Sequence, residues 1–170
     1  RIYRVTYPSR PLVKPAKIDG ESIEHLLDNL KLHEYRSRYR TRRELRGRDA
    51  NAVVAAVEKW VPSLEDDRHK LEALWVTWGM NRVNVDLLKT LLKSEDHKVR
   101  AGATRVLRFN EDKVADYQDL MLAAAGDEHG RVRIDHICLR LRGGGSFLTT
   151  ALGSTTSCCS SFLKKSSLAN

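Results

Sequence analysis

The residues with the clearest chemical potential are arginines that alternate with two tyrosines. Residues 31–48 hold eight Lys and Arg but two Glu, and so carry most of the chain's formal net charge of +8. Planar guanidinium groups bind phosphates and carboxylates, and the rings of Tyr35 and Tyr39 could stack on bases. If this stretch is helical, its arginines fall on two faces. One face carries Arg36, Arg40 and Arg43, and the other carries Arg38, Arg42 and Arg46.

Two interpretations of this stretch are open. In the first, the arginines form ion pairs with acidic residues of neighbouring helices, such as Asp49 and Glu58. In the second, they project outward on one face and bind nucleic acid or another protein. We expect the first, because the flanking segments supply enough acidic residues for pairing. A short basic segment alone would also bind nucleic acid only weakly and with a steep salt dependence.

The histidines and cysteines lack the spacing of a metal or haem site. Six histidines are scattered without an H-E-x-x-H pair, and three cysteines form neither C-x-x-C nor C-x-x-C-H. His129 and His136, with Cys138 nearby, do not match a metal-ligand pattern. We therefore expect no metal-binding or cofactor-binding residue in this chain.

Two pairs of carboxylates are better explained by helix starts than by acid-base catalysis. Asp66-Asp67 and Asp127-Glu128 both precede apparent helices. Carboxylates at such positions cap free amides and complement the helix dipole. No nucleophile, acid and base converge in the sequence, so we expect no catalytic residue and no enzyme activity.

Short amphipathic helices would position the arginines. Apolar residues recur at helical spacing over about 20–141, as in Ile23, Leu26, Leu27 and Leu30. The pattern predicts about eight helices in four hairpins that stack in sequence order. No apolar run reaches the roughly 18 residues of a membrane-spanning helix. The side chains expected in the core include Leu74, Trp75, Leu88, Val106 and Leu120.

The hairpins contain an internal repeat. "EDHKVRAGATRVL" resembles "EHGRVRIDHICL", and their Val-Arg pairs place Arg100 and Arg133 at an offset of 33 positions. "EYRSRYRTRREL" is a degenerate copy in which Arg38 matches Arg100. An acidic turn followed by Val-Arg is typical of HEAT-like repeats, and the ankyrin and tetratricopeptide patterns are absent. The sequence thus predicts an all-α fold, a HEAT-like helical-repeat solenoid, with Arg100 and Arg133 as signature residues.

The two ends of the chain differ from the repeats. Residues 1–8 alternate as in a strand and lead into a proline-containing linker, so 1–19 is interpreted as the end of an upstream strand-rich domain plus a linker. The helical-repeat domain would occupy 20–141. Residues 142–170 are rich in Gly, Ser and Thr, which predicts a disordered, low-complexity tail. An alternative is a shifted reading frame near 134–143.

Four segments of the chain resemble a known family. "RIYRVTYPSRPLVKP", "EYRSRYRTRRELRGRD", "LEALWVTWG" and "DEHGRVR" together resemble the PVC-type membrane-bound dehydrogenase, or haem-binding, family over about residues 1–134. The resemblance implies a sugar-dehydrogenase-like β-propeller, then a HEAT-like helical domain, then a cytochrome c domain. The propeller's catalytic residues and the haem site have no counterpart here, so none is carried over. Residues after 134 depart from the family's helical continuation.

The resemblance also implies a role within a larger protein. We expect a non-catalytic scaffold that spaces a redox propeller and a cytochrome c domain in a secreted or periplasmic protein, with haem c bound elsewhere in that protein. The partners would be neighbouring domains of the same protein or other proteins, and nucleic acid is not expected. The alternative is a free-standing solenoid that binds protein or nucleic acid through the arginine-rich helix 33–46.

Overall fold

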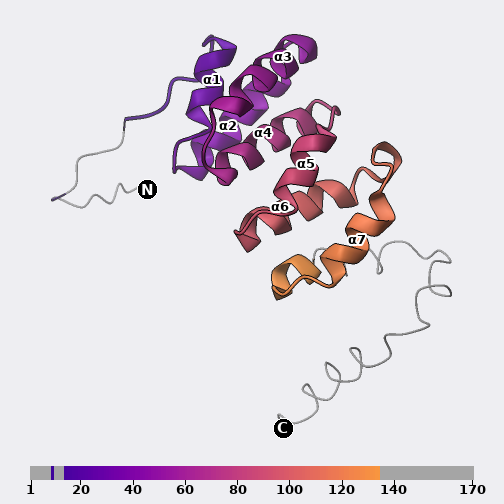
Figure 1. Ribbon diagram of the computed structural model, residues 1–170. Helices are drawn as coiled ribbons and strands as arrows, with labels where there is room; N and C mark the ends of the chain where they lie inside the picture. Colours follow the sequence, from indigo (N-terminus) through magenta and orange to yellow (C-terminus); the bar gives the residue numbers. More distant parts are fainter. Residues whose placement is uncertain (1–8, 10–13, 135–170) are drawn as a thin grey trace, which may run out of the picture. The chain divides into compact units, whose positions relative to one another are not determined.

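The computed structural model describes residue 9 and residues 14–134, and all regular structure in that part of the chain is helical (Figure 1). The expected all-α fold is therefore confirmed. Two 3₁₀ turns, Val61–Ser63 and Glu111–Lys113, follow the third and sixth helices, and residues 130–134 are again helical. The α-helices are α1 (Ile23–Asn29), α2 (Tyr35–Arg46), α3 (Ala50–Trp60), α4 (Asp67–Gly79), α5 (Val85–Leu91), α6 (His97–Arg108) and α7 (Tyr117–Ala125).

Several expectations fall on residues that lie outside the described part. These are the strand at 1–8, the low-complexity tail at 142–170 and the shifted reading frame near 134–143. They stay predictions.

The helices pack as pairs that stack in sequence order (Figure 1). α1 packs on α2, α3 on α4, and α5 on α6. Successive pairs meet where α1 contacts α3, α2 contacts α4 and α4 contacts α6, and α7 then packs on α6. The helical segment 130–134 packs against α6 and α7 through Val132, which forms a buried cluster with Ala101 of α6 and Ala124 of α7. The described residues thus form three complete hairpins and the beginning of a fourth.

Short polar side chains start most of these helices. In each case the side chain of the N-cap residue accepts a hydrogen bond from a free backbone N–H of the first turn, which stabilises a helix by about 1 kcal/mol. Asp66 has this role at α4, as the sequence predicts. The other capping residues are Ser22, Asp49, Asn84 and Asp96.

The core contains three of the five side chains that were expected in it. Leu74, Leu88 and Val106 have no exposed surface. The expectation was wrong for Trp75 and Leu120, which are half-buried. Trp75 lies at the margin of the buried face of α4, where the guanidinium of Arg42 from α2 covers its ring. Leu120 lies beside the buried stripe of α7, which is formed by Tyr117, Met121 and Ala124.

α4 and α6 approach each other closely at Gly102. A Cβ atom at that position would lie 2.7 Å from Cδ2 of Leu71 and 3.3 Å from Cζ2 of Trp75. Only glycine leaves room for this contact without a shift of the Leu71 side chain. The close crossing also brings the turn before α6 next to the first residue of α4, where polar side chains meet.

Candidate functional site

A basic side chain ties the start of each second helix to the turn before it. Arg38 of α2, Arg100 of α6 and Arg133 of the segment 130–134 each donate from Nη1 to the backbone carbonyl groups five and six positions earlier. These bonds satisfy carbonyl oxygens of the turn that have no partner within a helix. The accepting residues are Leu32 and His33, Ser94 and Glu95, and Asp127 and Glu128, at N–O distances of 2.6–2.9 Å.

This bond pattern defines the repeat more clearly than the Val-Arg signature does. It places Arg38 in the same role as Arg100, which is the match that the sequence suggested. In α4 the equivalent residue is Lys70, which donates from Nζ to the carbonyl oxygen of Glu65 at 3.4 Å. Sequence reasoning missed Lys70 because it is not an arginine. Its position four residues after the N-cap Asp66 is the signal that identifies it.

The first link between repeats joins α2 to α4. The Glu72 carboxylate of α4, whose side chain is 4% exposed, accepts a hydrogen bond from Arg38 Nε at 3.0 Å and another from Arg42 Nη1. Arg42 also lies over the Trp75 ring, 5.2 Å from its centre, an attractive cation–π geometry. We call Arg38, Arg42 and Glu72 the Glu72 clamp.

The Glu72 clamp corrects the partners that were expected for these arginines. Asp49 instead caps α3, where it accepts from the backbone N–H of Ala52 at 2.8 Å. Glu58 is exposed and forms no ion pair within the described residues. The acidic partner comes from the facing second helix, not from the helix that follows in sequence. The reason is that α2 packs on α4.

The second link joins α6 to the turn before segment 130–134. Arg100 donates from Nε and Nη2 to the two oxygens of Asp127, at 2.8 and 3.1 Å, in the two-pronged geometry that makes arginine–carboxylate pairs strong. The side chains are 11% and 13% exposed. Glu128 also accepts from Arg100 at 3.2 Å, but at 87% exposure it contributes little. We call Arg100 and Asp127 the Asp127 clamp.

A hydrogen bond and a ring contact complete these links. Ser94 Oγ donates to Asp67 Oδ2 at 2.6 Å, which joins the turn before α6 to α4. That bond lowers the pKa of Asp67, and Lys70 acts in the same direction. The rings of His97 and His129 stack with their centres 3.7 Å apart, which joins the starts of α6 and of the next helix.

The Asp127 clamp makes the fold sensitive to acid. The hydrogen bonds from Arg100 lower the pKa of Asp127, and the backbone N–H of His129 adds to the effect. Because the folded pKa lies below the unfolded one, the stabilisation is complete above about pH 4 and is lost as the pH falls through the folded pKa. Asp127→Asn should therefore flatten the decline of the unfolding free energy as the pH falls below about 4.

Urea unfolding followed by circular dichroism at several pH values measures this decline. Asp112→Asn changes an exposed carboxylate and is the matched control, whose profile should follow the wild type. An unchanged acid profile in Asp127→Asn would show that the Arg100–Asp127 pair does not form in solution.

The remaining arginines of α2 have a different environment. Arg36, Arg40, Arg43 and Arg46 are exposed, and none forms an ion pair with a described residue. The guanidinium of Arg46 lies against Gly79 of α4. Helical spacing in the sequence placed Arg46 on one face with Arg38 and Arg42, but only Arg38 and Arg42 reach Glu72.

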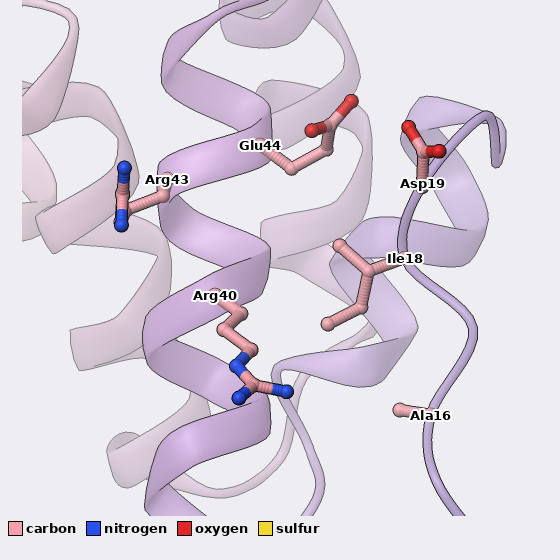
Figure 2. A pocket seen from close by; sticks show the side chains of 6 residues that line it. All are labelled: Ala16, Ile18, Asp19, Arg40, Arg43 and Glu44. Carbon is pink, nitrogen blue, oxygen red and sulfur yellow. The ribbon is translucent and has the colours of Figure 1, made fainter.

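Arg40 and Arg43 border a shallow groove between α2 and the segment that precedes α1 (Figure 2). Figure 2 shows the Arg40 guanidinium turned toward Ala16 and Ile18, whereas Arg43 extends away from them. Glu44 on the groove's rim is paired with Arg48 at 2.8 Å. The groove is open to solvent and carries no arrangement of nucleophile, acid and base.

The histidines and carboxylates do not gather into a metal site in the part of the chain that the structure describes. No group of three or more His, Cys, Asp or Glu side chains there could hold a metal ion. His129 is engaged with His97, and His136 and Cys138 lie outside the described residues. Likewise, no helix in 14–134 has the length and apolar character needed to cross a membrane.

Comparison of the chain with family models, curated proteins and solved structures gave no match to any of them.

Proposed function

We propose that this chain is a non-catalytic helical-repeat spacer of a larger protein, in which it holds neighbouring domains at fixed positions. The observation that carries the proposal is the pair of clamps that join successive repeats, one at Glu72 and one at Asp127. A carboxylate that receives two directed hydrogen bonds fixes the orientation of the groups around it. A stack joined in this way resists bending between repeats, which is the property a spacer needs.

The larger protein that we propose belongs to the PVC-type membrane-bound dehydrogenase, or haem-binding, family. Three of the segments that carry the resemblance contain four of the five clamp residues: "EYRSRYRTRREL" contains Arg38 and Arg42, "LEALWVTWG" contains Glu72, and "DEHGRVR" contains Asp127. In that protein the chain would space a redox propeller and a cytochrome c domain, in the periplasm or outside the cell. Haem c would be bound by the cytochrome domain and not by this segment.

The DNA on either side of the coding segment separates this proposal from a free-standing solenoid. Reading it in all frames should reveal a propeller with a signal peptide upstream and a C-x-x-C-H motif downstream. A start codon immediately upstream would contradict the larger protein.

The spacer role predicts a narrow distribution of distances along the stack. Nitroxide labels at Glu24→Cys on α1 and Leu122→Cys on α7 are suitable, because both positions are exposed. Cys138, Cys158 and Cys159 would be changed to Ser so that only these sites react. We expect pulsed electron paramagnetic resonance to give one narrow distance peak, because the clamps hold the repeats in one orientation.

A substitution that weakens the Glu72 clamp tests whether that clamp is what keeps the distance distribution narrow. Glu72→Gln should broaden the peak, because one oxygen acceptor of the clamp is lost, whereas Glu58→Gln on the surface of α3 should not. A broad distribution in the wild type, with no further change in Glu72→Gln, would rule out a rigid spacer.

A further inference from the structure

The outward face of α2 is built entirely from arginine and tyrosine. We define it as Tyr35, Arg36, Tyr39, Arg40 and Arg43, all of which are exposed. Ser37, Thr41 and Leu45 are buried on the opposite side. The outward face contains no aliphatic side chain, and the carboxylate beside Arg40 and Arg43, that of Glu44, is paired with Arg48. This composition is unusual for a helix surface that serves only to keep a protein in solution, where both signs of charge are mixed.

The three arginines of the outward face keep their charge available. They form no ion pair with a described residue, in contrast to Arg38 and Arg42, which Glu72 neutralises in part. Arg36 to Arg43 spans about 10 Å along the helix axis, at 1.5 Å per residue. The rest of the chain does not oppose this charge, because its formal net charge outside residues 31–48 is +2. The face thus presents a row of guanidinium groups to an anionic partner.

The two tyrosines offer exposed ring surface beside this row. Tyr35 is 63% exposed and Tyr39 is 48% exposed, and their rings stack with centres 6.3 Å apart. The guanidinium groups of Arg38 and Arg42 each lie 6.0 Å from the centre of the Tyr35 ring. Because Glu72 holds both arginines, these cation–π contacts also hold the ring in place. The stacking surface is therefore already formed before any partner binds.

We propose that the outward face of α2 binds single-stranded nucleic acid, with Arg36, Arg40 and Arg43 on the phosphates and Tyr35 and Tyr39 against the bases. A basic row beside exposed aromatic rings is the arrangement by which proteins bind single strands without sequence preference. In a duplex, paired bases do not offer their ring faces to a side chain. The proposal is independent of the spacer role, which depends on the inward-facing clamps.

A protein partner fits this face less well. Protein interfaces are enriched in Tyr and Arg, but their fully buried centre is mostly apolar and excludes water. The outward face has charge along its whole length, and the apolar side chains of the nearby groove, Ala16 and Ile18, lie beside it. A phosphate backbone needs only a line of cations, which this helix supplies.

Fluorescence anisotropy of the full chain with a labelled oligothymidylate of about 12 nucleotides tests the proposal. We expect a dissociation constant of about 1–100 µM at low salt and a linear fall of log K with log salt. The triple variant Arg36→Gln, Arg40→Gln, Arg43→Gln should reduce that slope by about 2, since each lost phosphate contact on a single strand removes about 0.7. The double variant Tyr35→Leu, Tyr39→Leu should weaken binding at least about fivefold with the slope unchanged.

A second triple variant separates the face from net charge alone. Lys59→Gln on α3, Lys93→Gln in the turn after α5 and Lys98→Gln on α6 remove the same charge at exposed positions, and this variant should bind as the wild type does. Thermal melts should show that all variants are folded, because the changed residues of the face are exposed and lie outside the core. Equal losses in the two triple variants would overturn the proposal. Undetectable binding or tighter binding of a duplex would also overturn it. So would binding of polyglutamate with equal affinity, if the tyrosine substitutions left that affinity unchanged.

Discussion

Glu72→Ala is expected to lower the free energy of unfolding by about 3 kcal/mol, because removal of one partner from a buried ion pair leaves an uncompensated charge. Here two charges lose their partner: the side chains of Arg38 and Arg42 are 11% and 17% exposed, so water screens them only in part. Urea unfolding at neutral pH, followed by far-ultraviolet circular dichroism, measures the change.

Two comparisons make this result specific to the Glu72 clamp. Glu58→Ala, at an exposed position on α3, should change stability by less than about 0.5 kcal/mol. A double-mutant cycle of Arg42→Met with Glu72→Met should give a coupling energy of about 0.5–3 kcal/mol, the range for residues in direct contact. A coupling energy near zero would mean that Arg42 and Glu72 do not pair in solution, whatever the cost of the single substitutions.

Arg100→Ala is expected to cost about 3–5 kcal/mol, because it breaks a buried pair on one side and removes several hydrogen bonds at once. The Arg100 side chain donates hydrogen bonds to the carbonyl oxygens of Ser94 and Glu95 as well as to the Asp127 carboxylate. Each buried acceptor left without a donor adds its own desolvation cost of about 1–3 kcal/mol. The loss should show in urea unfolding, and in faster amide exchange at residues 127–134, which Arg100 holds against α6.

Arg100→Lys tests whether the planar guanidinium matters as well as the charge. Lysine cannot reproduce the two-pronged contact with Asp127 while also reaching both carbonyl groups, so it should recover only part of the loss. Arg131→Ala, at an exposed position on the same segment as Arg133, is the matched control and should be nearly neutral. Full stability in Arg100→Lys would show that positive charge alone holds this joint.

Periodicity and repeat spacing were sufficient to predict the helices and to match Arg38 with Arg100 as equivalent positions of the repeat. Helical apolar spacing depends only on neighbours along the chain, and α2 accordingly covers Tyr35–Arg46, close to the expected 33–46. The bonds from Arg38 and Arg100 to the preceding turns span five or six residues, so the same local sequence recreates them in each repeat.

The choice of long-range partners was decided only by the tertiary structure. Glu72 lies 34 positions from Arg38, and nothing in the sequence favours it over the nearer Asp49 or Glu58. The packing of α2 on α4 brings Glu72 within reach of two arginines and leaves Glu58 on the surface.

The division of the arginines between two roles was decided in the same way. The sequence determined that α2 has two arginine-bearing faces, because that follows from 3.6 residues per turn. Which face turns inward depends on Ser37 and Thr41, whose small side chains let α2 approach its neighbours and are buried there. That contact directs Arg38 and Arg42 toward Glu72 and leaves Arg36, Arg40 and Arg43 outside. Helical periodicity fixes the angle between side chains on one helix, but only the packing of one helix on another fixes which side is buried.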